Sequence, residues 1–509
     1  MKFERASGIL LHPTSLPGPY GSGDVGPEAH RFVDKLQEMG QKIWQILPLG
    51  PTSYGDSPYQ SPSTFAGNPL WISFDLLAKD KLLTKAQLKN YPAFPEGRVD
   101  YGPVIAARMK VLEKACGQFE RKASAEMKAE YEAFCARHAG WLEDYALFAA
   151  LKDAHGGAPW TQWAPELARR EPGALEASRA KLACEMRNVK IAQYLFDRQW
   201  KKLREHCARQ RVKLVGDIPI FVAHDSADVW ANPGLFFLKP DGHPSVVAGV
   251  PPDYFSATGQ LWGNPLYNWA AHKAQNYDWW AARLRRILEL VDVVRIDHFR
   301  GFEAYWEVPG GETTAMNGKW VKGPDRHLFD ALRARMGDLP IIAEDLGVIT
   351  PPVEELRDHC GFPGMRILQF AFGNDDRAAE FRPESYPAHC CVYTGTHDND
   401  TTVGWFNSQA GAGSTRTQEE IDAERKMILD YLRTDGREIH WDLINLGSRS
   451  NADTFVVPLQ DLLGLGSEAR MNTPGVAGGN WQWRFGWSQL TDAIRDRFAY
   501  VTRATGRMH

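Results

Sequence analysis

Long apolar runs, paired cysteines and an excess of charge are all missing from this 509-residue sequence. No stretch reaches the ~18 apolar residues that a membrane-spanning helix needs, and the amino terminus lacks the features of a signal peptide. The seven cysteines form no CxxC pair, which favours reduced thiols in a cytoplasmic protein over a disulfide framework. The net charge of −4 makes a neutral partner more plausible than nucleic acid or an acidic membrane surface.

Short apolar runs that end in polar residues are abundant, and they are typical of strands in a parallel sheet covered on both faces. Amphipathic helical stretches such as residues 279–290 and 325–337 precede several of them. Eight such units predict an α/β protein built as a (β/α)₈ barrel, with a doubly wound open sheet as the alternative. Polar residues at the strand ends favour the barrel, because in a barrel the carboxyl ends of the strands converge on one face. The predicted strands are residues 7–13, 42–50, 212–222, 291–299, 339–347, 364–370, 389–398 and 454–464.

Two gaps between predicted strands are too long for ordinary connections. We expect a single barrel over residues 1–509 that carries inserted, partly helical subdomains. Residues 51–211 are interpreted as a largely helical insertion between the second and third strands, because much of the segment is rich in Ala, Lys and Glu. Residues 223–278 are interpreted as a second, shorter insertion between the third and fourth strands.

The run VDVVRIDHFRGF, residues 291–302, starts as a buried strand and ends in charged residues. Strand alternation places Arg295 and Asp297 on one face and Ile296 and His298 on the other. A structural ion pair is the simple interpretation of Arg295 and Asp297. A neighbouring guanidinium also favours the ionised form of a carboxylate, which is the form a nucleophile requires.

Two further predicted strands bring carboxylates to the same rim: Glu344 in IIAEDLG, and Asp398 beside His397 in YTGTHDND. Burying several like charges is costly unless each is paired. Chemistry on neutral sugars offers a reason for them, since one carboxylate attacks the anomeric carbon while a second, protonated one serves the leaving oxygen. Glu344 follows two isoleucines and an alanine, so it is the better candidate for a raised pKa.

A metal site is the alternative use of these residue types. Asp297, His298, Glu344, His397 and Asp398 could supply ligands for zinc or iron, but the sequence has no HExxH, no HxH and no 2-His-1-carboxylate spacing within one element. We therefore expect no metal and no other cofactor.

Three segments, VRIDHFRG (294–301), IIAEDLG (341–347) and YTGTHDND (393–400), resemble the catalytic segments of the amylomaltases. This family is also called the 4-α-glucanotransferases or disproportionating enzymes. The likeness covers most of the chain and is least clear near residues 104–210. Further segments that resemble the family are residues 7–26, 55–69, 250–269 and 470–475.

The resemblance implies a retaining transglycosylase on an α-amylase-like barrel, with α-1,4-glucans and maltooligosaccharides as its partners. It implies that Asp297 is the nucleophile, that Glu344 is the general acid/base and that Asp398 stabilises the oxocarbenium-like transition state. Retention requires the nucleophile and the acid/base to lie ~5–5.5 Å apart, which the ends of neighbouring barrel strands can provide. The substrate contacts implied by resemblance include Arg295, His298, His397, Tyr59, Ser57 and Asn472.

A transferase must hold an acceptor sugar and exclude water, and the segment 249–269 suits that task. It combines Tyr254 and Trp262, which we expect to contact substrate, with Phe255, Tyr267 and Trp269. In the family a loop here arches over the cleft. The alternative is a loop anchored by its own aromatic side chains.

Two tyrosines outside this segment are also assigned by resemblance. Tyr54 and Tyr101 are expected to form part of a second glucan-binding site, as in some relatives, or else to be ordinary surface aromatics. For Ser57 and Tyr59 the alternative to sugar contact is simple turn chemistry in the sequence GDSP.

Other functions stay open at this point. A glucan hydrolase on the same barrel would share the chemistry, and a non-catalytic glucan-binding protein would share the aromatic residues. Residues 464–469 read G-x-G-x-x-A behind a predicted strand and nominally fit a dinucleotide fingerprint, but a βαβ unit would need another strand about twenty residues on.

Overall fold

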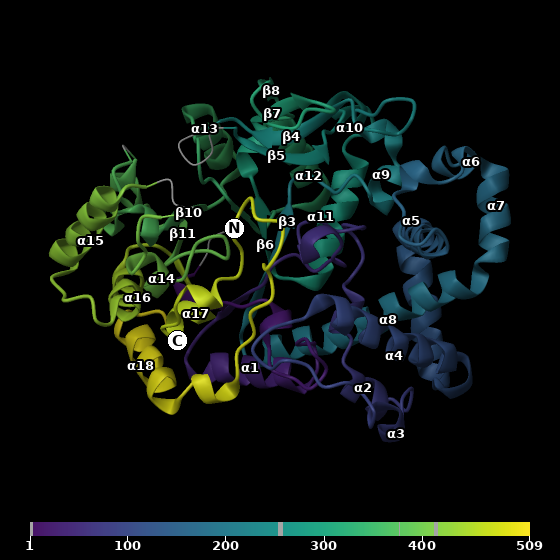
Figure 1. Ribbon diagram of the computed structural model, residues 1–509, viewed down its shortest axis with the longest axis horizontal. Coiled ribbons are helices and arrows are strands. Elements are labelled where there is room, and N and C mark those ends of the chain that lie inside the picture. The colour runs from purple at the N-terminus through teal and green to yellow at the C-terminus, as the bar shows by residue number, and fades with distance from the viewer. Residues whose placement is uncertain (1–3, 253–257, 376, 412–415, 509) are drawn as a thin grey trace.

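The computed structural model describes residues 4–252, 258–375, 377–411 and 416–508 (Figure 1). Eight parallel strands form one sheet in the order β10-β11-β12-β1-β2-β3-β6-β9. The two strands at the ends of this order also meet, because the Ala343 amide donates to the Pro363 carbonyl at 3.0 Å. The sheet is therefore a nearly closed (β/α)₈ barrel rather than an open sheet. Its strands are β1 (Ala6–Leu10), β2 (Ile43–Gln45), β3 (Lys213–Pro219), β6 (Val293–Asp297), β9 (Ile341–Ala343), β10 (Gly364–Ile367), β11 (Cys390–Tyr393) and β12 (Thr454–Pro458).

All eight predicted strands are confirmed, each shorter than its apolar run, and the predicted helices at 279–290 and 325–337 are confirmed as α11 and α12. No helix of the described ranges has an apolar stretch long enough to cross a membrane. Helices that follow barrel strands are α1 (Pro27–Glu38), α8 (Ala183–Arg209), α11 (Asp278–Leu290), α12 (Arg326–Met336), α13 (Pro351–Cys360), α16 (Ile439–Arg449) and α18 (Asp492–Ala504). Shorter or peripheral ones in the last third are α14 (Thr402–Phe406), α15 (Gln418–Leu432) and α17 (Leu459–Leu462).

Helices fill the long connection between β2 and β3. Figure 1 shows α5, α6 and α7 standing to one side of the barrel. The last helix of the connection, α8, packs against α4 and α5 and also against α1, so it joins this helical region to the barrel wall. The helices that precede α8 are α2 (Phe74–Lys79), α3 (Lys85–Leu88), α4 (Tyr101–Lys122), α5 (Ala125–Ala154), α6 (Pro165–Ala168) and α7 (Pro172–Lys181).

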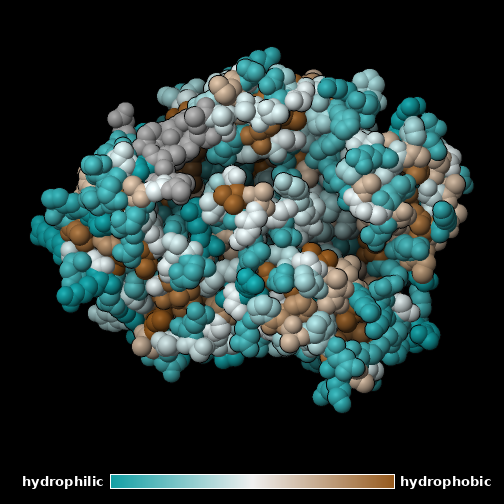
Figure 2. All heavy atoms as spheres, in the orientation of Figure 1, coloured by the Kyte–Doolittle hydropathy of each residue, from teal (hydrophilic) through white to brown (hydrophobic). Residues whose placement is uncertain are grey.

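A second, antiparallel sheet in the order β5-β4-β7-β8 was not predicted from the sequence. Its strands follow the carboxyl ends of β3 and β6, so the sheet stands at the mouth of the barrel (Figure 1). In the space-filling view the surface is hollowed beneath it, with hydrophobic atoms beside the hollow (Figure 2). The elements of these two connections are α9 (Ala227–Ala231), β4 (Val246–Val250), β5 (Gln260–Pro265), α10 (Trp269–Ala274), β7 (Ala304–Pro309) and β8 (Lys319–Lys322).

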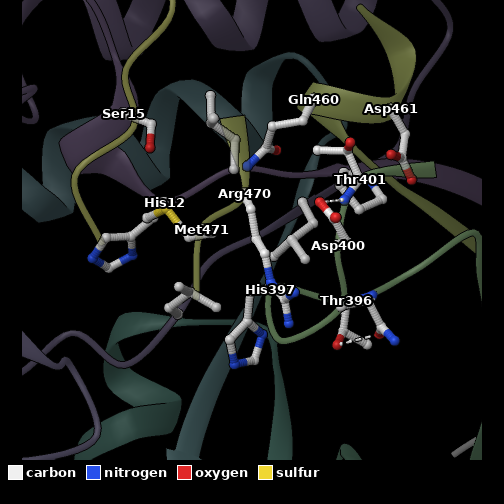
Figure 3. Close-up of a pocket in the computed structure, with 15 residues that line it drawn as sticks. His12, Ser15, Thr396, His397, Asp400, Thr401, Gln460, Asp461, Arg470 and Met471 are labelled. Atoms are coloured by element: carbon white, nitrogen blue, oxygen red, sulfur yellow. Dashed lines mark hydrogen bonds between the residues drawn. The ribbon is translucent and has the colours of Figure 1, made fainter. Parts of the chain in front are cut away.

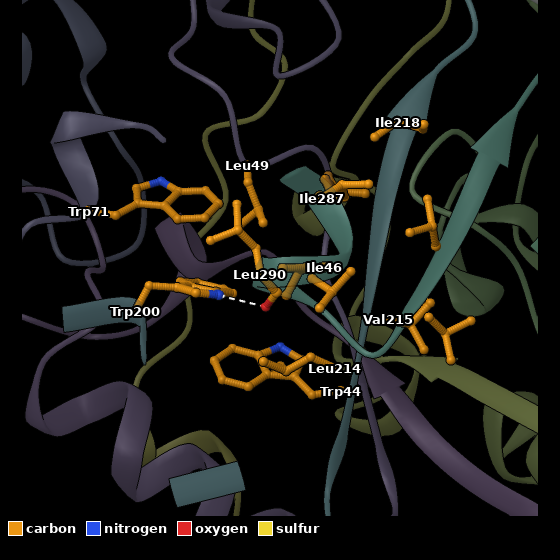
Figure 4. Close-up of a cluster of buried hydrophobic side chains, with 14 of the residues drawn as sticks. Trp44, Ile46, Leu49, Trp71, Trp200, Leu214, Val215, Ile218, Ile287 and Leu290 are labelled. Carbon is orange, nitrogen blue, oxygen red and sulfur yellow. Dashed lines mark hydrogen bonds between the residues drawn. The ribbon is translucent and has the colours of Figure 1, made fainter. Parts of the chain in front are cut away.

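Several of the eighteen tryptophans lie in the layer between barrel and helices (Figure 4). Trp44, Trp71 and Trp200 are each at most 1% exposed. The Trp200 indole N–H donates to the Leu290 carbonyl at 2.7 Å, and that of Trp44 donates to the Leu11 carbonyl at 2.8 Å. The indoles of Trp44 and Trp200 therefore fill the core while their polar atoms stay paired.

The chain ends meet at the amino-terminal side of the barrel strands through a fully buried arginine. Arg507 has no exposed surface, and burial, together with the neighbouring Arg5, lowers the pKa of Arg507 to about 9. Its guanidinium donates to five backbone carbonyls, those of Ala6, Ser448, Ser450, Ala452 and Asp453.

Replacing Arg507 by leucine is expected to lower the free energy of unfolding by about 3 kcal/mol or more, because buried carbonyls lose their donor. The shift in the midpoint of urea unfolding measures this loss. Arg503→Leu is the matched control, since Arg503 is exposed on the same terminal segment. Equal midpoints for the two variants would show that the buried arginine does not hold the chain ends.

Candidate active site

A buried arginine organises the centre of the barrel mouth. Arg295 on β6 is 3% exposed, and it donates through Nη1 to Asp217 Oδ2 at 2.7 Å and through Nη2 to Asp297 Oδ1 at 3.0 Å. The predicted alternation is confirmed for Arg295 and Asp297, which share a face of the strand. Burial alone would lower the pKa of Arg295, but the charges of Asp217 and Asp297 raise it well above its usual value.

Asp217 is a site residue that sequence reasoning missed. It lies on β3 directly opposite Arg295 in the strand register, and it is fully buried. Burial raises the pKa of Asp217 to about 7, although Arg295 and the hydroxyl of Tyr59 act in the opposite direction. The one signal in the sequence was an aspartate inside the apolar strand KLVGDIP, where an unpaired carboxylate would be costly.

Glu344 follows β9 and is 9% exposed. Its two carboxyl oxygens accept backbone N–H groups, Oε2 from His298 at 2.6 Å and Oε1 from Leu346 at 2.9 Å. Burial, and next the charge of Asp297, raise the pKa of Glu344 to about 8, in spite of those hydrogen bonds. The upward direction of the pKa predicted for this residue is therefore confirmed, and burial favours the protonated form of Glu344.

The predicted alternation fails at His298. The strand ends at Asp297, and His298 has left-handed backbone angles (φ 54°, ψ 49°) that turn its N–H toward Glu344. Its ring meets Trp262 of β5 edge to face, with centroids 4.8 Å apart. Burial lowers the pKa of His298 to about 3, so the imidazole is neutral and retains both donor and acceptor capacity.

A third group of side chains comes from the loop after β11. His397 Nε2 lies 3.4 Å from Asp398 Oδ2 and 2.9 Å from the hydroxyl of Tyr59, whose ring stacks on the imidazole. The Tyr59 hydroxyl also donates to Asp217 Oδ2 at 2.9 Å, which links this group to the central arginine. Asn472 Nδ2 donates to Asp398 Oδ1 at 2.6 Å.

A pocket behind His397 contains a second residue that sequence reasoning missed (Figure 3). Arg470 donates to the backbone carbonyl of Asp398 at 2.7 Å and to that of Asn472 at 2.8 Å. It therefore ties the segment after α17 to the Asp398 loop. Also in the pocket lining is His12, whose pKa burial lowers to about 3.

The remaining predicted contacts divide into three groups. Ser57 Oγ accepts the Tyr59 amide at 3.2 Å, as turn chemistry requires, and Trp262 lies beside His298 as described. Tyr267 and Trp269 pack against each other, and fully buried Tyr267 donates to the Ile220 carbonyl, so these two aromatics anchor the segment. The predicted contact Tyr254 and its neighbour Phe255 lie outside the described residues.

The two tyrosines assigned to a second glucan site differ. Tyr54 is 76% exposed and open to solvent. Tyr101 is only 4% exposed, and its hydroxyl donates to the Trp481 carbonyl at 2.9 Å. The surface-aromatic alternative is therefore wrong for Tyr101, because its ring is buried on α4 against a segment 380 residues later. Its part in a second glucan-binding site stays a prediction.

The dinucleotide interpretation of residues 464–469 is also wrong. β12 ends at Pro458, helix α17 intervenes, and among the described residues no later strand completes a βαβ unit. Within the same described ranges, no three His, Cys, Asp or Glu side chains are grouped to hold a metal ion.

The mouth of this barrel thus holds Glu344, whose pKa burial raises, and Asp297, which accepts a hydrogen bond from Arg295. Two carboxyl groups in such different surroundings at the mouth of a (β/α)₈ barrel are typical of enzymes that act on glycosidic bonds. The sequence profile of the 4-alpha-glucanotransferase family matches residues 11–489. The chain belongs to this family, and the predicted 4-α-glucanotransferase activity is confirmed.

Individual relatives are similar to this chain over nearly their whole length. The 4-alpha-glucanotransferase of Thermus thermophilus is 50% identical, with 100% of both chains covered. That of Synechocystis sp. is 49% identical over 99% of this chain and 98% of the relative. The solved amylomaltase from Streptococcus agalactiae in complex with acarbose is 38% identical and superposes with a TM-score of 0.93, covering 99% of this chain and 100% of that one.

Proposed function

We propose that this chain transfers segments of α-1,4-glucans by a retaining double displacement at Asp297, Glu344 and Asp398. In the first half, an Asp297 oxygen attacks the anomeric carbon of the donor, and Glu344 gives its proton to the departing 4-oxygen. The bond between that carbon and oxygen breaks, and a glycosyl ester on Asp297 forms. In the second half, the 4-hydroxyl of an acceptor glucan gives its proton to Glu344 and attacks the same carbon, which frees Asp297.

The observation that supports this assignment is the contrast between the two carboxyl groups. Glu344 has its pKa raised to about 8 by burial and by the charge of Asp297, so it holds the proton that a general acid must deliver. Asp297 Oδ1 accepts from the Arg295 guanidinium at 3.0 Å, which holds this carboxyl group in place for attack. Different environments thus give two carboxyl groups two roles.

Asp398 is the proposed stabiliser of positive charge on the sugar ring. Its side chain is 42% exposed, and both of its oxygens have neighbours, with Oδ1 accepting from Asn472 and Oδ2 near His397. These contacts hold the carboxylate in place before substrate arrives, so little reorganisation is needed as charge develops. The proposed contacts to the reacting sugar and its neighbours are Tyr59, Ser57, Arg295, His298, His397 and Asn472.

Transfer rather than hydrolysis requires that an acceptor sugar displace water from the glycosyl ester. Trp262, packed edge to face with His298, is the described aromatic that we assign to this task, and Tyr254 remains an expectation by resemblance. The exposed Tyr54 remains a proposed contact for glucan outside the cleft. A reducing, cytoplasmic compartment is the proposed location, because all seven cysteines are free.

The experiment that tests the reaction is incubation with maltotriose alone, followed by resolution of the products by chain length. Glucose together with oligomers longer than maltotriose is the result expected of transfer. Glucose and maltose with nothing longer would mean that water resolves the intermediate, and the acceptor-site argument would be wrong.

Replacing Tyr59 by phenylalanine is expected to reduce kcat/KM for maltotriose about tenfold, because Asp217 loses a donor and His397 loses its hydroxyl partner. Steady-state kinetics measure the effect. The matched control is Tyr20→Phe, which removes a tyrosine–aspartate hydrogen bond of the same 2.9 Å length to Asp75, outside the site. If both variants lost activity equally, the Tyr59 hydroxyl would have no special role.

A further inference from the structure

The second sheet carries an exposed tryptophan that packs against a buried arginine and a second tryptophan. Trp320 of β8 is 41% exposed, whereas the guanidinium of Arg300 lies 3.8 Å from the centre of its ring. Trp306 is its cross-strand partner on β7, and the two indoles meet edge to face with centroids 5.3 Å apart. Arg300 itself is 5% exposed, so the ring rests on a buried support rather than on a mobile surface side chain.

Arg300 also contacts the segments that carry the proposed catalytic residues. Arg300 belongs to the short 3-10 helix Phe299–Phe302 that follows Asp297. Its Nη1 donates to the backbone carbonyl of Val348, which lies four residues after Glu344 and is itself 51% exposed. One buried arginine therefore fixes Trp320 to the segments that follow both Asp297 and Glu344.

Two exposed lysines lie on the same short strand as Trp320. Lys319 and Lys322 lie on either side of Trp320 in sequence, with side chains that are 73% and 68% exposed. Lys319 pairs with Glu307 of β7, and Lys322 pairs with Glu303, the residue just before β7. Binding sites for small polar molecules commonly combine an aromatic surface with a few oriented hydrogen-bonding groups.

We propose that Trp320 is an outlying platform on which the glucan chain stacks beyond the acceptor subsites. The proposal rests on the proposed function, in which Glu344 protonates the leaving group. That group leaves, and the acceptor glucan enters, on the Glu344 side of the barrel mouth. The apolar C–H face of a glucose unit fits an exposed indole, and its hydroxyls can bond the Lys322 ammonium group, which shares the face of β8 with Trp320. A long glucan reaches this platform, whereas maltotriose reacts without it.

The test compares Trp320→Ala and Trp320→Phe with the parent enzyme, using amylose and maltotriose as substrates. Trp320→Ala is expected to raise KM for amylose by about three- to tenfold, since an aromatic contact contributes about that much. Its kinetics with maltotriose are expected to stay unchanged, and Trp320→Phe is expected to restore most of the affinity. Tyr500→Ala is the control, because Tyr500 is 70% exposed on α18 at the opposite edge of the molecule (Figure 1).

A second readout separates the platform from the chemistry. Retardation of each variant in an amylose-containing gel, measured in an Asp297→Ala background, reports glucan binding without turnover. If the proposed mechanism were wrong, the single variant Asp297→Ala would still transfer glucan, and this result does not depend on the residue at position 320. The platform is overturned if Trp320→Ala leaves both the KM for amylose and the gel retardation unchanged, or if it impairs the reaction of maltotriose as much as that of amylose. It is also overturned if the parent enzyme is a dimer and Trp320→Ala dissociates it, because Trp320 would then be a subunit contact.

Discussion

Asp297→Ala is expected to reduce glucan transfer by more than about 10⁴-fold, because the variant has no group that can form the glycosyl ester. The structure gives a reason to expect a loss of chemistry rather than of folding. Asp297 is partly exposed at a strand end, and Arg295 keeps a second carboxylate partner, Asp217, when Asp297 is removed. Steady-state rates with maltotriose, beside thermal melting of both proteins, measure the two effects separately.

Azide provides the discriminating control for Asp297→Ala. The anion can occupy the space of the missing carboxylate and attack the same face of the anomeric carbon, so an α-glucosyl fluoride is expected to yield a β-glucosyl azide. Asp345→Ala is the comparison variant, since Asp345 is a buried carboxylate beside the site that accepts from Arg357 and the Met365 amide. Rescue of Asp345→Ala by azide, or an α-configured product from Asp297→Ala, would contradict the nucleophile assignment.

Glu344→Gln is expected to reduce kcat/KM for maltotriose by about 10²- to 10⁴-fold, the usual contribution of a general acid. With an α-maltosyl fluoride donor the first step needs little proton transfer, so formation of the glycosyl ester is expected to be much less affected. A single-turnover measurement of fluoride release tests this. Equal losses with both donors would mean that Glu344 holds substrate or structure rather than a proton.

The pH profile of the unmodified enzyme checks the same assignment. Because burial and Asp297 raise the pKa of Glu344 to about 8, the acid form is present at neutral pH and disappears as pH rises through about 8. We therefore expect kcat/KM for maltotriose to fall on the alkaline side near pH 8. The rate of fluoride release from α-maltosyl fluoride is expected to show no such fall near pH 8. A fall in that rate would mean that a group other than Glu344 ionises there.

Much of this site could be predicted because strand ends are marked in the sequence. The β-branched run before Arg295 and Asp297, and the apolar residues before Glu344, identified buried strands whose last residues reach the barrel mouth. Strand alternation then predicted correctly that Arg295 and Asp297 share a face. It failed one residue later, because His298 adopts left-handed backbone angles that no side-chain pattern announces.

The partners could not be predicted, because they depend on how distant strands lie beside one another. Asp217 meets Arg295 across 78 residues through the β3–β6 register, and Arg470 reaches Asp398 across 72. Burial of Tyr101 depends in the same way on Trp481. The second sheet was missed because most of its strands carry neither a continuous apolar run nor a regular alternation of apolar and polar residues.

The backbone hydrogen bond from His298 to Glu344 has a consequence for how this fold diversifies. The residue after the proposed nucleophile donates directly to the proposed acid/base, and backbone hydrogen bonds of Glu344 with Ile296 and Phe299 join the same two segments, so the spacing of the two carboxyl groups is fixed within the barrel rim. The aromatic residues proposed to contact the glucan, Trp262 and Trp320, lie on other strands and make none of these hydrogen bonds. Specificity can therefore be rebuilt in the connections that carry those strands by insertion or deletion while the reacting pair keeps its separation.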